Sequence, residues 1–166
     1  MTTFKLPIGG IFVLLMSTKV HNFKSIYSMP LTLTVTEGVL PSEKIKEAVV
    51  QITNSFLKNH GLTGNTVMTP NITANVHIIP KGLSFSGGEE FSGAWAEWKV
   101  PSFALADHSI VKQHFMEVTE IIYKLAGGKQ PKDNIYVNVV HAVNGGWNLD
   151  GIAMTNDELG AAISEG

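Results

Sequence analysis

The chain has 166 residues, 44% of them hydrophobic, which is typical of one globular domain with a core of its own. Its formal net charge of −2 gives no electrostatic footprint for a nucleic acid. Cysteine is absent, which excludes disulfides and thiolate metal sites, and all 12 basic residues are lysine, which excludes the bidentate carboxylate recognition that arginine provides.

The first 29 residues differ from the rest of the chain. Residues 6–16 form an apolar run that is too short to span a bilayer, and no Ala-x-Ala signal-cleavage pattern precedes Met29. Three interpretations stay open: a start assigned upstream of the true one, a leader that is removed, or an extension that stays and packs. We treat 1–29 as an N-terminal extension or mis-assigned start and 30–166 as a single domain.

Met29-Pro30 directly precedes the first predicted strand. A proline can enter an edge strand for structural reasons alone. At a chain terminus, however, proline is a secondary amine, and terminal amines have a pKa near 8, close to where a general base works best. Pro30 is therefore a candidate catalytic base on the condition that its nitrogen is free. If the preceding residues stay attached, the nitrogen is an amide and cannot act as a base.

The next three elements form a strand, a helix and a strand. Leucine and valine alternate with threonine over 31–36, which predicts a half-buried strand. A helix follows, with Ser42 as its expected N-cap and Gly61 as the residue just beyond its end. Its apolar face is formed by Ile45, Val49, Ile52 and Phe56. Residues 72–79 predict a second strand.

The same order then repeats. A glycine-rich stretch over 81–93, expected to be a loop, leads to a strand over 95–100. Asp107 is the expected N-cap of a second helix, which ends at Gly127-Gly128. A fourth strand over 135–140 precedes a short tail piece at 147–154.

This order predicts an α+β (α/β) fold in which one β-α-β unit is used twice, with halves at about 30–90 and 91–155. Right-handed crossovers place both helices on one face of a four-stranded sheet. The other face carries Thr32, Thr34, Asn75, His77 and Lys99. Either water or neighbouring subunits cover it, and the sequence leaves that choice open.

The chain resembles the tautomerase superfamily, and in particular its 4-oxalocrotonate tautomerase branch. The resemblance rests on Met29-Pro30-Leu31, on a first strand ending in Thr36-Glu37-Gly38, and on the segment 81–89, which reads KGLSFSGGE. The double length and the segment 60–64 also resemble the cis-3-chloroacrylic acid dehalogenase group. The resemblance extends over about residues 30–155.

The resemblance implies a cofactor-independent keto-enol tautomerase or isomerase acting on a small carbonyl, 2-oxo acid-like substrate. It implies a homotrimer with pockets near the subunit contacts. We also expect a cytoplasmic location and neither nucleic acid nor membrane as a partner. In such enzymes the N-terminal proline nitrogen takes a proton from a carbon next to a carbonyl, and the proton returns at another carbon. Pro30 matches that proline.

The resemblance also implies the pocket residues. Phe85 matches the family's pocket aromatic, and an apolar wall there disfavours the charged form of the amine. Asn75 either hydrogen-bonds a substrate carbonyl or enol, or is a polar residue on a solvated strand. Trp147, the counterpart of Phe85 in the second half, either lines a neighbouring subunit's pocket or packs in the core.

The chain departs from the family where carboxylates are bound. The arginine positions hold Val39 and Asn75, and residues 103–108 lack the arginine pair of the dehalogenase group. A dicarboxylate substrate and dehalogenation are therefore disfavoured. Lys81 and Lys99 are the candidate replacements, acting as point charges rather than planar forks.

Two other functions stay open. One is a non-catalytic binding or assembly protein on the same fold, suggested by the missing arginines and the extension. The other is a decarboxylase or hydratase, for which Asp150 is the candidate water-activating acid. The six histidines show no metal-ligand spacing, so no metal site is expected.

Overall fold

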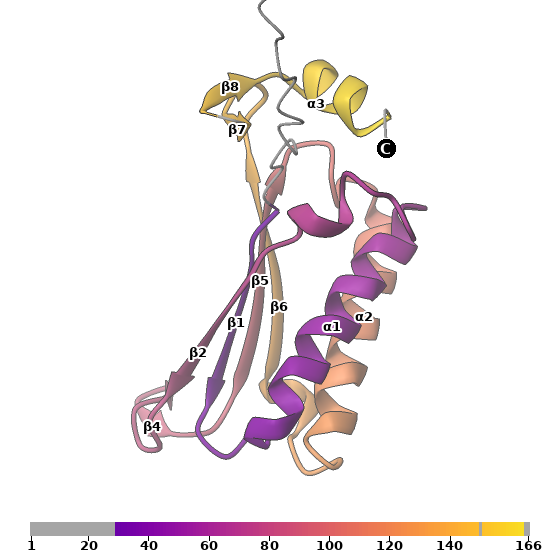
Figure 1. The fold of residues 1–166 in the computed structure, drawn as a ribbon. Helices are drawn as coiled ribbons and strands as arrows, with labels where there is room; N and C mark the ends of the chain where they lie inside the picture. Colours follow the sequence, from indigo (N-terminus) through magenta and orange to yellow (C-terminus); the bar gives the residue numbers. More distant parts are fainter. Residues whose placement is uncertain (1–28, 150, 165–166) are drawn as a thin grey trace, which may run out of the picture.

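The computed structural model describes residues 29–149 and 151–164. Four strands form the main sheet in the order β2-β1-β5-β6, and two helices, α1 (Ser42–Asn59) and α2 (His108–Leu125), cover one face of it (Figure 1). The strands are β1 (Leu31–Thr36), β2 (Ala74–Ile79), β5 (Ala94–Pro101) and β6 (Ile135–Ala142). The predicted fold class is confirmed.

The sheet joins two β-α-β units back to back. β1 pairs with β2 in parallel, β5 pairs with β6 in parallel, and β1 and β5 meet antiparallel at the centre. Leu33 of β1 lies between Val76 of β2 and Ala96 of β5 in this register. Each half therefore contributes an inner strand, a helix and an edge strand, as the repeated order predicts.

The core lies between the sheet and the helices because each element has one apolar side. Leu31, Leu33 and Val35 of β1 are buried, whereas the threonines between them are half-buried. Phe56 of α1 and Ile122 of α2 are also fully buried. Each such side chain contributes about 1.5–3 kcal/mol when it leaves water.

The ends of the helices follow the expected chemistry in part. Asp107 is the N-cap of α2, and its carboxylate accepts hydrogen bonds from the N–H groups of Ser109 and Ile110. Gly61 lies just beyond the end of α1 with φ +67°, which suits glycine. The expected Ser42 cap is wrong: Pro41 is the N-cap, no side chain caps it, and Ser42 is the first helical residue.

Several small elements were missed or misplaced. The glycine-rich stretch contains a hairpin of β3 (Phe85–Ser86) and β4 (Glu89–Glu90). The tail forms a second hairpin, β7 (Trp147–Leu149) and β8 (Ile152–Met154), followed by the unpredicted helix α3 (Asn156–Ile163). β2 begins at Ala74, two residues later than expected, and a short 3-10 helix (Thr69–Asn71) precedes it.

The two hairpins lie at opposite ends of the sheet (Figure 1). The β3–β4 hairpin lies beyond the C-terminal ends of β1 and β2, while β7, β8 and α3 lie beyond the C-terminal end of β6. In the described part of the chain, no helix is long and apolar enough to cross a membrane.

Candidate functional site

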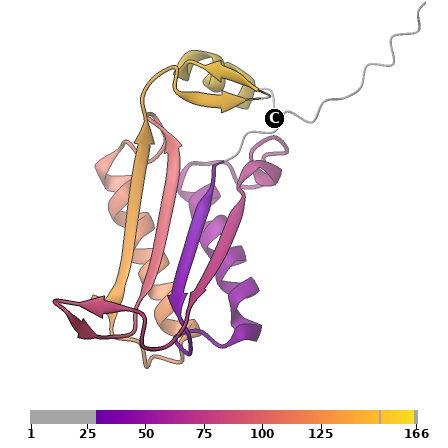
Figure 2. The same cartoon turned by 90° about the vertical axis from the view of Figure 1, so that its left-hand side faces the viewer.

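The face of the sheet opposite the helices, here called the open face, is turned toward the viewer in Figure 2 and carries two of the predicted site residues, Pro30 and Asn75. The strand register places its residues in rows across the sheet. They are Thr32 and Thr34 of β1, Asn75 and His77 of β2, Trp95, Glu97 and Lys99 of β5, and Tyr136, Asn138 and Val140 of β6. This confirms that the polar residues expected there share one face.

Pro30 lies directly before β1, at one end of this face. The backbone N–H of Lys99 donates to the Pro30 carbonyl at 3.0 Å, which extends the β1–β5 register by one pair. Two residues paired in this way have Cα atoms about 5.5 Å apart and side chains on the same face. Lys99 is therefore the cross-strand neighbour of Pro30.

Met29 belongs to the folded structure. Its side chain is only 3% exposed, and its N–H donates to the carbonyl of Asn71 at 2.8 Å. While Met29 is attached, the Pro30 nitrogen is an amide. The remainder of the predicted extension, residues 1–28, lies outside the described residues.

An ion pair lies next to Pro30 on the open face. Lys99 Nζ lies 3.4 Å from the Glu97 carboxylate, and the side chains are 55% and 38% exposed. Within the four strands of the main sheet, all of which the structure describes, Lys99 is the one lysine. The sequence pointed to Lys99 as a candidate charge but did not reveal its pairing with Glu97.

Asn75 lies on the neighbouring strand β2 and is exposed. It pairs with Thr32, one row further along the sheet than Pro30, so its Cα is about 8 Å from that of Pro30. An amide at this range can reach a ligand bound at Pro30. His77 pairs with Thr34, another row away.

Within a single chain, Phe85 lies far from Pro30. Ser84, its neighbour, shares a buried hydrogen bond of 2.8 Å with Thr36, the last residue of β1. Six strand residues therefore separate Phe85 from Pro30, a distance of roughly 20 Å. Phe85 is 60% exposed at the far end of the sheet.

Trp147 lies at the same end of the sheet as Pro30, because β6 runs toward that end before β7 begins. Its side chain is half-buried and packs against the hydrophobic core. Asp150, the candidate acid for hydration chemistry, lies outside the described residues.

Two histidines hold the loop over 102–106, which overlaps the segment 103–108 that lacks the arginine pair of the dehalogenase group. His60 Nε2 accepts the N–H of Leu105, which has the unusual φ of +52°, while His60 Nδ1 lies 2.9 Å from the Phe56 carbonyl. Burial lowers the pKa of His60, and the bond to Phe56 opposes this. On the other side of the loop, His141 Nε2 lies 2.9 Å from the Ala104 carbonyl. These histidines have structural roles.

An aromatic cluster covers the other end of the open face. Trp95 and Tyr136 stack with ring centroids 5.8 Å apart, and Phe91 meets both rings edge-on. The strand register places Trp95 directly opposite Tyr136, which brings the two rings together. Such stacking is favourable. Phe91 and Trp95 are half-buried, and Tyr136 is 36% exposed.

A buried polar cluster joins the two helices. His114 Nδ1 lies 2.9 Å from Ser55 Oγ, and Ser55 donates to the Glu117 carboxylate at 2.6 Å. Burial, together with the charge of His60, lowers the pKa of His114 to about 4. Burial alone would raise the pKa of Glu117, but hydrogen bonds led by those from Lys58 and Ser55 lower it to about 2. The cluster is a neutral histidine beside a fixed carboxylate, not a nucleophile activated by a base.

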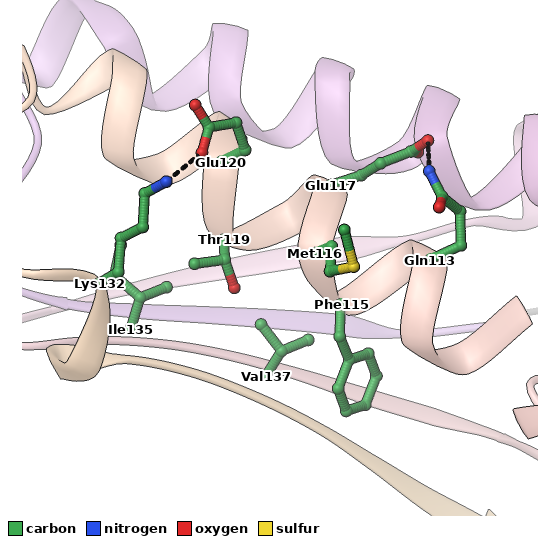
Figure 3. A pocket seen from close by; sticks show the side chains of 9 residues that line it. All are labelled: Gln113, Phe115, Met116, Glu117, Thr119, Glu120, Lys132, Ile135 and Val137. Atoms are coloured by element: carbon green, nitrogen blue, oxygen red, sulfur yellow. Dashed lines mark hydrogen bonds and ion pairs between the residues drawn. The ribbon is translucent and has the colours of Figure 1, made fainter. Parts of the chain in front are cut away.

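A groove of about 600 Å³ runs between α2 and the edge strand β6 (Figure 3). Its floor is apolar, with Phe115, Ile135 and Val137, and the Glu120–Lys132 ion pair lies on its rim. No residue of the open face lines it. Among residues 29–149 and 151–164, no group of three potential metal ligands is close enough to hold an ion.

No known protein-family profile and no curated protein matches the sequence. Solved structures do match the fold. An asymmetric trimer of wild-type fused 4-OT is 12% identical with a TM-score of 0.63, over 79% of this chain and 98% of that chain. Pt0534 inactivated by 2-oxo-3-pentynoate is 14% identical with a TM-score of 0.63, over the same 79% and 98%. FG41 malonate semialdehyde decarboxylase inhibited by 3-bromopropiolate is 8% identical with a TM-score of 0.54, over 71% and 86%. At these identities the likeness is one of fold.

Proposed function

We propose that this chain, whose fold is that of the tautomerase superfamily, is a cofactor-independent keto-enol tautomerase or isomerase that uses Pro30 as its general base. The observation that carries the proposal is the position of Pro30, next to the start of β1 on the open face and beside Lys99. A small carbonyl compound of the 2-oxo acid type fits a site with one base, one cation and neutral polar groups.

The proposed reaction moves one proton. The nitrogen of Pro30, once free, takes a proton from the carbon next to the substrate carbonyl, and the C–H electrons form the enol double bond. The carbonyl π electrons move to oxygen at the same time, and the proton is then delivered either to that oxygen, which gives the enol, or to another carbon of a conjugated substrate, which gives the isomer. Ketonisation of an enol is the first of these paths in reverse. A terminal amine with a pKa near 8 needs only a modest lowering to be largely neutral at pH 7, and partial burial acts in that direction.

The proposal includes a homotrimer, because the site is incomplete in one chain. Phe85 is exposed roughly 20 Å from Pro30, and apolar residues on the edge strands, such as Ile78 and Val140 at 48% exposure, are suited to contacts between copies. The fused 4-OT structures are trimers. In such an assembly the Phe85 of another subunit would line the pocket of Pro30.

The central test compares two forms of the protein that differ by one residue. One begins at Pro30, and the matched control retains Met29. With phenylenolpyruvate as substrate, ketonisation should be lost in the control by more than about 100-fold, because an amide nitrogen is not a base. Pro30→Ala in the first form should also reduce the rate. Equal activity in all three proteins would refute the role of Pro30.

Mixing two inactive variants tests the shared pocket. Pro30→Ala and Phe85→Ala trimers, unfolded and refolded together, should regain part of the activity, because some mixed sites then combine an intact Pro30 with an intact Phe85 from another subunit. Separately refolded samples are the control. No recovery in the mixture would place both residues in one subunit's site or exclude Phe85 from it.

A non-catalytic binding or assembly protein is the second candidate, and one observation favours it. Met29 is buried and hydrogen-bonded to Asn71, so the residue that blocks the Pro30 nitrogen is part of the fold. The intact mass of the protein from its native host separates the two candidates. A mature chain that starts at Pro30 supports the enzyme, and one that retains Met29 supports the binding protein. A decarboxylase or hydratase would need a water-activating acid beside Pro30.

A further inference from the structure

We propose that the Met29–Pro30 bond is cleaved before the domain folds and that the folded domain protects this bond. Folding then decides whether the nitrogen of Pro30 is a free amine or an amide. Such control acts on the proposed catalytic base, so the inference rests on the proposed function of Pro30.

The backbone on both sides of this bond belongs to the sheet. The N–H groups of Met29 and Leu31 each donate at 2.8 Å to a carbonyl within residues 71–73, which lead into β2. Between them, the carbonyl of Pro30 accepts the N–H of Lys99 in β5 at 3.0 Å. The start of β1 is therefore held from both sides, as an inner strand of the sheet.

The side chains next to the bond are also inaccessible. Met29 is 3% exposed and Leu31 is 0% exposed, and both belong to the hydrophobic core. An aminopeptidase that is specific for methionine has to bind the methionine side chain, so Met29 would first have to leave the core. Proteases in general act on loop tips and on transiently opened segments, not on backbone that is paired in a sheet.

Opening this segment is costly. It breaks three backbone hydrogen bonds and exposes the two buried apolar side chains. Losses of this size lower the population of the open form by at least about 1,000-fold. When the segment recloses faster than the protease cuts, the rate of cleavage follows that population.

The cleavage itself is a hydrolysis by water. The Met29 carbonyl carbon takes the hydroxyl group, the bond to the Pro30 nitrogen breaks, and that nitrogen takes the hydrogen. Methionine, or a longer segment that ends in it, leaves as the acid. A chain that is cut while unfolded carries the amine, and a chain that folds first keeps the amide. The ratio of the two folded products depends on the rate of cleavage relative to the rate of folding.

The test follows the removal of Met29 by intact mass. The protein begins at Met29 and retains every described helix and strand, and circular dichroism compares its folding with that of the full chain. A methionine aminopeptidase is added to this folded protein and, separately, to a peptide with the sequence of residues 29–34. We expect removal from the folded protein to be at least about 1,000-fold slower than removal from the peptide.

Two variants on α2 show whether cleavage requires unfolding. Ile122→Val shortens a fully buried side chain and should speed the removal of Met29 by about threefold to tenfold, because it raises the unfolded fraction. Lys112→Ala changes an exposed side chain of the same helix and should leave the rate unchanged. Removal within about 100-fold of the peptide's rate, or a slow rate that does not respond to Ile122→Val, would overturn the inference.

Amide hydrogen exchange in the full 166-residue chain measures the protection without a protease. The N–H groups of Met29 and Leu31 should exchange as slowly as those in the middle of β1. Exchange of Met29 at the rate of an exposed loop would show that the start of β1 frays by itself, and would overturn the inference.

None of these measurements depends on catalysis. Slow removal of Met29, together with a protein beginning at Pro30 that converts no enol, supports the protection and refutes the proposed function. Rapid removal from the folded protein that yields active enzyme does the reverse.

Discussion

His114 should make the stability of this fold depend on pH. Its side chain is fully buried between α1, α2 and β5, against the rings of Phe56 and Trp98. Nδ1 is satisfied by Ser55, but Nε2 is buried and has no hydrogen-bond partner within the described residues. Protonation would place a charge on an edge of the ring where nothing compensates it.

The sign and size follow from the pKa of His114, which is lowered from 6.5 to about 4 in the folded state, mainly by burial. Between those values the unfolded chain binds the proton and the folded chain does not, so the free energy of unfolding falls as the pH falls. At about 1.4 kcal/mol per unit of pKa difference, the loss from pH 7 to pH 5 is about 2 kcal/mol. The lowered pKa of His60 acts in the same direction.

Urea unfolding followed by circular dichroism at pH 7, 6 and 5, at one protein concentration, measures this slope. His114→Phe should remove most of it. The matched control is Trp98→Phe, which disturbs the same packing without removing a titrating group. It should lower stability at every pH and keep the wild-type slope. If His114→Phe also keeps the wild-type slope, the burial argument is refuted.

Two further predictions concern stability away from the site. Thr155→Ala removes a capping box in which Thr155 and Glu158 bond each other's backbone N–H groups, so it should cost about 1 kcal/mol and speed amide exchange in α3 while the sheet stays protected. Unchanged exchange in α3 would contradict the role of the cap. Gly93→Ala places a methyl group 3.0 Å from the rings of Phe91 and Trp95, and should lower the free energy of unfolding by about 1–3 kcal/mol and shift the tryptophan emission. An unchanged melting temperature would mean that the rings of Phe91 and Trp95 move aside at no cost in free energy, and it would contradict this prediction.

The repeated strand–helix–strand order predicted the fold because each element carries its own pattern. Alternation along β1 and the 3.6-residue spacing along α1 specify which side of each is buried, and that is enough to stack two helices on one face. Asp107 was found for the same reason, since its capping bonds reach only two and three residues along the chain.

What the sequence did not reveal depends on partners far apart in the chain. The Ser55–His114 bond spans 59 residues, and neither residue carries a local signal of it. The roughly 20 Å between Phe85 and Pro30 depends on where the β3–β4 hairpin lies relative to β1. The helix α3 was missed although its signal was present: Thr155 and Glu158 stand at the spacing of a capping box.

The two β-α-β halves have the same order of elements but differ in the residues that precede their first strands. β1 is entered through Pro30, whereas β5 is entered through Gly93 and the fully buried Ala94, in the middle of a continuous backbone. A polypeptide has one amino terminus, so covalent fusion of the halves leaves the second strand entrance without any route to a reactive amine. The proposed base therefore belongs to the first half alone, while the second half supplies Lys99 as the cross-strand neighbour of Pro30.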